Sequence, residues 1–127
     1  MDDAELARLH QTVQAAPADT AARLALLHEL VVAQRWHEAE QMGSPLLQAE
    51  DAPAAVYTCM GIIYGQQGRW DEAVQQCRQA LALHPDDVLT LFNMGILLVR
   101  QDDTKAALEC LEKVVEHASD WAEAHYT

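Results

Sequence analysis

The stretch Y-T-C-M-G-I-I-Y-G-Q-Q-G-R-W-D-E-A-V-Q-Q-C-R-Q-A-L-A-L-H-P, from Tyr57 to Pro85, decides the fold of this chain. In its first half, large and small apolar residues follow the i, i+3, i+4, i+7 spacing of one helical face: Tyr57, Met60, Gly61 and Tyr64. This spacing predicts an amphipathic helix.

The second half of the stretch predicts another helix of the same kind, with a stripe made of Ala73, Val74, Cys77, Ala80 and Leu81. Gly68 stands between the two stripes and suits the left-handed residue that ends a helix. Pro85 closes the second helix, because proline cannot continue one. The stretch therefore reads as a helical hairpin.

The hairpin pattern recurs when the sequence is shifted by 34 residues, so that Trp36 falls on Trp70 and Ala39 falls on Ala73. The shift defines three full units, residues 20–53, 54–87 and 88–121. Residues 1–19 form the second half of an earlier unit, and residues 122–127 open a further one. Because one hairpin cannot bury both of its apolar faces, the units must stack on each other. We therefore expect a single all-α domain.

The middle unit resembles the tetratricopeptide repeat in both the identity and the spacing of its residues. The resemblance rests on Tyr57, Met60, Gly61, Tyr64, Gly68, Trp70, Asp71, Glu72, Ala73, Ala80 and Pro85, and in the third unit on Leu91, Met94, Gly95, Leu98, Ala107, Leu111 and Val114. It covers nearly the whole chain. It implies a right-handed α-solenoid of antiparallel helix hairpins that binds partner proteins.

The first unit departs from this pattern in two places. Leu27 stands where the other units have Gly61 and Gly95, so its two helices should lie further apart. Gly43-Ser44-Pro45 falls inside its second helix, where a proline costs about 3 kcal/mol. We expect a kink or a break there.

Composition excludes several classes of protein. No apolar run reaches the length of about 18 residues that a membrane span needs. The acidic start Met1–Glu5 is not a secretory signal, so we expect a cytoplasmic protein. The net charge of -12 argues against nucleic acid or an anionic membrane as partner. The three cysteines have no C-x-x-C spacing, which argues against a disulfide framework or a zinc site.

Catalytic motifs are also missing from the sequence. It has no nucleophile elbow, no glycine-rich phosphate loop and no H-E-x-x-H. Its six histidines include no pair at metal-ligand spacing on one helical face. We expect no enzymatic activity, no metal and no cofactor.

In such a solenoid the first helix of each unit lines a concave groove. We expect the groove to consist of Leu24, His28, Cys59, Ile62, Gln66, Leu89, Phe92, Asn93, Ile96, Arg100 and Tyr126. Between Val88 and Val99 only Thr90 and Asn93 are polar, so this helix has more apolar residues than a core needs. An apolar or amphipathic segment of a partner protein would cover the surplus.

Other occupants of this surface stay open at this stage. A further helix of the same polypeptide, or a homodimer formed through the 88–101 helix, would also cover the apolar surplus. The chain could instead be the repeat region of a larger enzyme, such as a transferase or a hydroxylase, whose catalytic domain lies outside it. The sequence names neither the partner nor the pathway.

Overall fold

The computed structural model describes the backbone of residues 3–16 and 19–126, and the side chains of these residues as far as Ala118. In the described part of the chain helices alternate with short turns, and there is no strand. Its helices are α1 (Asp3–Ala15), α2 (Thr20–Val32), α3 (Trp36–Leu47), α4 (Ala54–Gln66), α5 (Trp70–Leu83), α6 (Val88–Arg100) and α7 (Thr104–Tyr126).

The turns inside the hairpins repeat with the period of the sequence. Gln34, Gly68 and Asp102 all have a positive φ, at 60°, 77° and 61°, and lie 34 residues apart. Glycine adopts this left-handed conformation without strain, whereas the other two residues pay a steric cost. The common turn geometry therefore comes from the packing of the hairpins, and glycine is not required for it.

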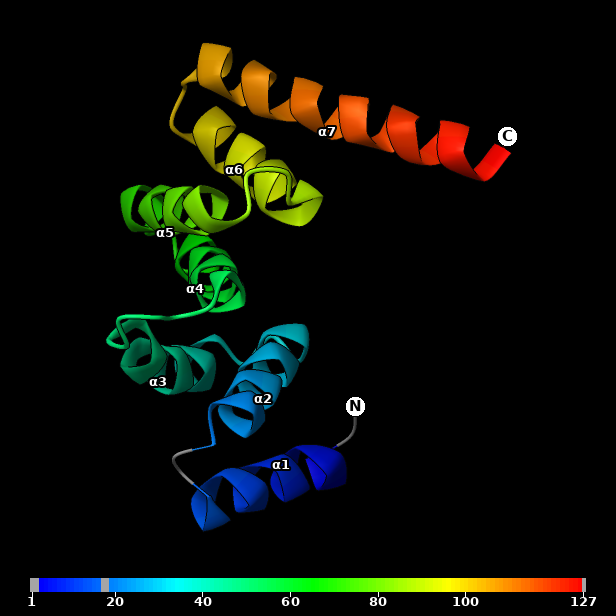
Figure 1. Ribbon diagram of the computed structural model, residues 1–127. Coiled ribbons are helices and arrows are strands. Elements are labelled where there is room, and N and C mark those ends of the chain that lie inside the picture. The colour runs from blue at the N-terminus through cyan, green and yellow to red at the C-terminus, as the bar shows by residue number, and fades with distance from the viewer. Residues whose placement is uncertain (1–2, 17–18, 127) are drawn as a thin grey trace.

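The hairpins are stacked in chain order, with α1 at one end and α7 at the other (Figure 1). Each helix packs against its neighbours in sequence, and α4 also packs against both α2 and α6. This is the expected α-solenoid. Its core lies between successive helices and is formed by fully buried residues of three hairpins, among them Leu26, Leu30, Met60, Ile63, Leu91 and Leu98.

A buried hydroxyl pair joins the second and third hairpins. The Oγ1 atoms of Thr58 on α4 and Thr90 on α6 lie 2.9 Å apart, and both side chains are buried. Thr90 also donates to Oδ2 of Asp87 at 2.6 Å, at the start of α6. Because these polar groups satisfy one another away from water, they fix the position of α6 against α4.

Hydrogen bonds across the first and second hairpins meet at Glu40. Gln67 and Arg69, from the turn between α4 and α5, donate to its carboxylate at 3.0 and 2.7 Å. The bonds from Gln67 and then from Arg69 hold the pKa of Glu40 below its ordinary value. The first hairpin thus contacts the second through the side chain of Glu40 on α3.

The first hairpin is more loosely apposed, as expected. The backbones of α4 and α5 run close together over more of their length than those of α2 and α3. Leu27 of α2 packs against Gly43 of α3, whereas in the second hairpin the glycine, Gly61, is on the first helix and meets Cys77. In the first hairpin the large residue is therefore on the first helix and the glycine on the second, the reverse of the second hairpin. Either arrangement keeps the core filled.

Of the kink or break expected at Gly43-Ser44-Pro45, the break is wrong, and the kink stays a prediction. α3 continues through Pro45 and ends at Leu47, two residues later and short of Ala49. Pro45 lies in the last turn, where the missing N–H removes a single helical bond. Beyond it the chain tightens, because the N–H groups of Gln48 and Ala49 donate to carbonyls only three residues back.

The last helix differs from the expected register of the repeats. The 34-residue shift sets Ser119 opposite Pro85 and makes residues 122–127 the start of a new helix. In the structure, α7 is continuous through Ser119 to Tyr126, so residues 122–126 prolong it. In Figure 1 its C-terminal half extends beyond α6. The continuity has a local reason, since Ser119 keeps the backbone N–H that proline lacks at the end of α5.

Candidate functional site: a groove between α4 and α6

A hollow of about 310 Å³ separates α4 from α6. Five of its lining residues belong to the groove that the sequence predicts: Ile62, Gln66, Asn93, Ile96 and Arg100. They come from two helices that are joined through α5 and the turns flanking it, and they line one hollow because α4 and α6 pack against each other. The hollow is an open cleft with mixed apolar and amide walls.

Arg100 supplies the positive charge of this hollow. Its guanidinium carbon lies 5.0 Å from the centre of the Trp70 ring, so the cation stacks over the aromatic face. No carboxylate is among the residues that line the hollow. In a chain of net charge -12 the hollow is therefore a local exception to the acidic surface.

Asn93 places an unused donor at the same hollow. Its Nδ2 is buried, and no described residue accepts a hydrogen bond from it. A buried amide N–H without an acceptor costs about 1–3 kcal/mol. An acceptor group from a bound molecule would relieve that cost. Gln66, which is exposed at the rim, offers a second amide.

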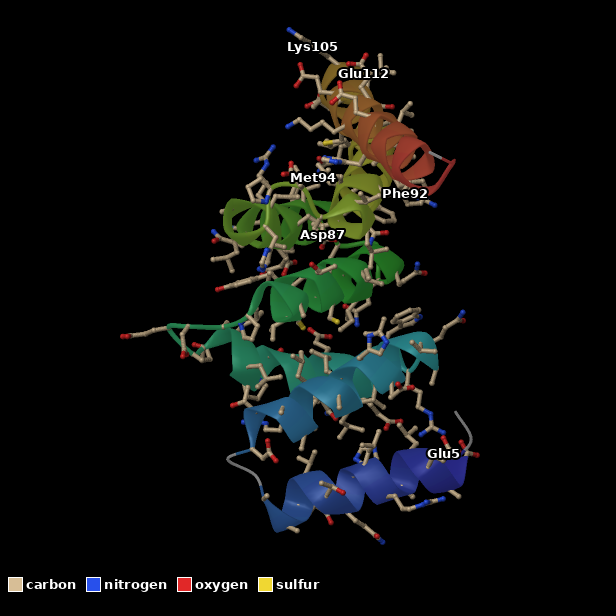
Figure 2. All side chains as sticks on the ribbon, turned by 45° about the vertical axis from the view of Figure 1, so that its right-hand side comes forward. Glu5, Asp87, Phe92, Met94, Lys105 and Glu112 are labelled. Carbon is tan, nitrogen blue, oxygen red and sulfur yellow. The ribbon has the colours of Figure 1, made fainter. Side chains whose placement is uncertain are left out.

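The outward side of α6 extends the site beyond the hollow. Leu89 and Phe92 are 57% and 47% exposed, and Ile96 is 40% exposed. Figure 2 shows Phe92 and Met94 leaving α6 on different sides, and Met94 is buried in the core. The helix thus has a second apolar stripe that the core does not use.

The structure does not bring every predicted groove residue to this surface. Leu24 on α2 is half-buried and packs against the core, and Cys59 on α4 is buried. His28 is exposed on α2 and does not line the hollow. The side chain of Tyr126 lies outside the described residues.

Four lining residues were not among the predicted groove residues: Gly61, Gly65, Trp70 and Leu97. Leu97 of α6 packs over Gly65, where a Cβ would lie 3.1 Å from Cδ2 of Leu97. Trp70 also packs against the core. Its second role, as a wall of the hollow, has no signal in the sequence.

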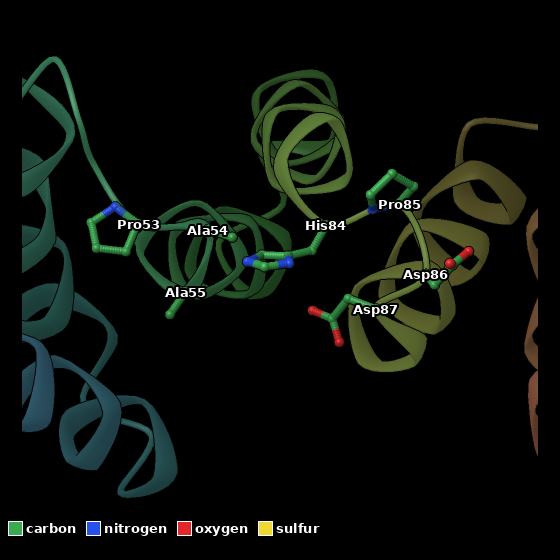
Figure 3. Close-up of a pocket in the computed structure, with 7 residues that line it drawn as sticks. All are labelled: Pro53, Ala54, Ala55, His84, Pro85, Asp86 and Asp87. Carbon is green, nitrogen blue, oxygen red and sulfur yellow. The ribbon is translucent and has the colours of Figure 1, made fainter. Parts of the chain in front are cut away.

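A larger hollow, of about 650 Å³, opens between the turns that precede α4 and α6. Figure 3 shows His84 lying between Ala54 and Asp87 there. It contains none of the predicted site residues. Among the described residues, no three His, Cys, Asp or Glu side chains are grouped so that they could hold a metal ion. No described helix is both long and apolar enough to cross a membrane.

Comparison with solved structures supports the architecture. The fold is similar to that of MamA from Desulfovibrio magneticus RS-1, with a TM-score of 0.81 at 21% sequence identity over 91% of this chain and 65% of that chain. It is also similar to MamA MSR-1, with a TM-score of 0.79 at 20% identity over 93% of this chain and 68% of that one. At this identity the likeness shows the fold alone. The chain spans less than two thirds of the length of the first of these structures.

Comparison of sequences is informative at the level of the family. A search of curated proteins gave no match. The sequence model of the tetratricopeptide repeat matches residues 53–120, which is more than half of the chain and covers α4, α5, α6 and α7 as far as residue 120. This protein therefore belongs to the tetratricopeptide repeat family.

Proposed function

We propose that this chain binds an apolar or amphipathic segment of a partner protein in the groove between α4 and α6. Its membership of the tetratricopeptide repeat family supports a role as a protein-interaction scaffold. The observation that carries the finer proposal is the second apolar stripe of α6, formed by Leu89, Phe92, Ile96 and Val99, which stays exposed while the opposite side of the same helix is buried.

Burial of this stripe would supply most of the binding free energy. Each large apolar side chain that leaves water contributes about 1.5–3 kcal/mol, less the cost of association. Phe92 is the strongest anchor, because aromatic residues dominate protein interfaces. The exposed stripe is continuous with the hollow through Ile96, so one bound segment can contact both.

The polar residues of the hollow would set the register of the bound segment. The free N–H of Asn93 and the amide of Gln66 can bond to carbonyl oxygens, and Arg100 can pair with a carboxylate. Such groups distinguish one sequence from another by the cost of leaving a buried donor unpaired.

The first prediction concerns Phe92 and Ile96. Peptides selected from a random displayed library on the unaltered protein should lose at least about tenfold in affinity when either Phe92→Glu or Ile96→Asp is introduced, because a charge replaces an apolar contact. Titration of labelled peptides would measure the loss. Val32→Glu is the matched control, since Val32 is an exposed apolar residue of α2 outside the groove.

The thermal unfolding midpoint of each variant shows whether a loss of peptide affinity comes from the changed surface or from loss of the fold. Exposed positions should tolerate the charge, so the midpoint should change by no more than a few degrees. Outright unfolding would show that Phe92 and Ile96 are core residues, and the proposal would fail. Unaltered peptide affinity in folded variants would contradict it equally. A dimer in sedimentation that these substitutions dissociate would assign the stripe to a second copy of the chain.

A further inference from the structure

We infer that a second surface, on the outer side of α7, docks an amphipathic helix of another protein whose apolar stripe is flanked by lysine or arginine. This surface, called the end face below, consists of Leu108, Leu111, Glu112, Val115 and Glu116, which together line a hollow of about 470 Å³. It lies outside the groove between α4 and α6, and the inference does not rest on that groove.

The repeat itself shows what kind of element covers such a face. Positions 40, 74 and 108 are equivalent under the 34-residue shift. Glu40 bonds to Gln67 and Arg69 in the following hairpin, and Val74, which is 4% exposed, borders a hollow with Gln101 at the end of α6. Leu108 is 54% exposed. In the first two hairpins this position faces the next hairpin; on α7, among the described residues, it faces none.

A second position repeats the comparison. Leu81 of α5 is half-buried against the core, whereas its equivalent on α7, Val115, is 64% exposed. In the second hairpin the covering element is a helix, α6, which packs against both α4 and α5. The end face is therefore equivalent to the face of α5 that a helix, α6, covers. Within the described chain, seven of the nine large exposed apolar side chains lie on α6 and α7, so this end of the solenoid is the apolar one.

The charge of the rim determines the chemistry of that helix. Glu112 and Glu116 are exposed beside the apolar residues, and Figure 2 places Glu112 at the outer end of the stack. Their equivalents are Arg78 and Ala82 on α5, and Ser44 and Gln48 near the end of α3. Neither inner face, each followed by another hairpin of this chain, has a carboxylate at these positions. Among these equivalent positions, only the two on α7 are acidic.

Charge complementarity selects the occupant. A basic amphipathic helix would place cations against Glu112 and Glu116 and would be attracted by the net charge of -12. A second copy of this chain would bring its own two carboxylates to the same acidic rim, and like charges in an interface are unfavourable. A helix with lysine or arginine beside its apolar stripe is therefore the occupant that fits.

The test uses two designed helical peptides with identical leucine spacing, one with lysine and one with glutamate at every polar position. Fluorescence anisotropy at about 0.1 M salt, where screening beyond about 10 Å suppresses distant attraction, measures their affinities. The lysine peptide should bind and the glutamate peptide should not. Glu112→Lys with Glu116→Lys should weaken binding of the lysine peptide about tenfold.

A matched control separates the end face from the general acidity of the protein. Glu50→Lys with Asp51→Lys changes the net charge by the same amount at two exposed residues of the turn before α4. It should leave the affinity within about twofold, because the two charges lie far from the end face. If both double variants lost affinity for the lysine peptide equally, the binding would depend only on the net charge of the protein, and the proposal would be overturned.

Two further outcomes would also overturn it. Loss of the lysine peptide in Phe92→Glu, with Val115→Ser unaffected, would place the peptide in the groove between α4 and α6. A dimer in sedimentation that Val115→Asp dissociates would assign the end face to a second copy. Both Val115 substitutions are at an exposed site, so the protein should remain folded.

Discussion

Glycines set the distance between paired helices at single positions. A Cβ on Gly61 would lie 2.8 Å from Sγ of Cys77 and 3.4 Å from the carbonyl oxygen of Ala73. Gly95 meets Leu111 in the third hairpin in the same way. In the first hairpin the small residue is Gly43 on the second helix, where a Cβ would meet Sδ of Met60 on α4 first and Leu27 of α2 next. What the fold requires is therefore one small partner in each pair, on either helix.

At Gly61 this requirement can be measured. Gly61→Ala should lower the free energy of unfolding by about 1–3 kcal/mol, because the new methyl group overlaps the Cys77 sulfur in a packed core. Urea unfolding gives the value. The penalty should shrink when Gly61→Ala is made in a Cys77→Ala background, where the sulfur is absent. An equal penalty in both backgrounds would mean that the thiol is not the obstacle.

At the level of the element, α3 shows how a helix tolerates a proline. Pro45 follows Gly43, which is buried, and the helix reaches Leu47 before the chain turns. The position of Pro45 within the last turn limits the damage to one missing hydrogen bond. The helix ends at Leu47, two residues after the proline, and has no break.

Pro45→Ala should therefore lengthen α3 toward Ala49 and raise the free energy of unfolding by about 1 kcal/mol, with the regained hydrogen bond partly offset by the greater freedom of the unfolded chain. Circular dichroism would show the added helix, and urea unfolding the added stability. Glu50→Ala, outside the helix, serves as the control. If Pro45→Ala destabilises the protein, the proline is acting through the unfolded state.

α6 is the element in which scaffold and site coincide. One side of this helix buries Leu91, Leu98 and Thr90 against the neighbouring helices. The other side exposes Phe92 and Ile96, and Ile96 also lines the hollow. A helix with two apolar stripes can hold its place in the stack and still present surface to a partner.

For the molecule as a whole, the buried thiols couple stability to pH. Burial raises the pKa of Cys59 from 9.0 to about 11 and that of Cys77 to about 12. In the unfolded chain both thiols ionise near the ordinary value, so above it the unfolded state binds fewer protons than the folded state. The stability from keeping them protonated is fully present below pH 9 and is lost as the pH rises toward 12.

The free energy of unfolding should accordingly fall above pH 9 by as much as about 1.4 kcal/mol per pH unit for each thiol. Urea unfolding at a series of pH values would measure the slope. A variant with Cys59→Ala and Cys77→Ala should be less stable at neutral pH but should show a shallower fall. Parallel slopes in the two proteins would show that the thiols do not cause the pH dependence.

The positions of the helices follow from the sequence, because the apolar spacing and the 34-residue period are local properties of the chain. Gly68 and Pro85 indicated a turn and a helix end directly. Of the groove residues that the sequence predicts, five line one hollow together with Trp70: Ile62, Gln66, Asn93, Ile96 and Arg100. Their part in binding stays a prediction. The 34-residue period of the sequence is enough to select these positions on α4 and α6.

Only the tertiary structure decided which of those residues are accessible. Cys59 and Ile62 are three residues apart on one helix, yet Cys59 is buried while Ile62 lines the hollow. Whether a side chain is covered depends on how closely the neighbouring helix approaches, and that distance is set by pairs such as Gly61 with Cys77 and Leu27 with Gly43, which meet only after the hairpins have packed. The sequence by itself determined the helices, their order and their period; the packing between them determined the hollow, the exposed stripe of α6 and the end face of α7.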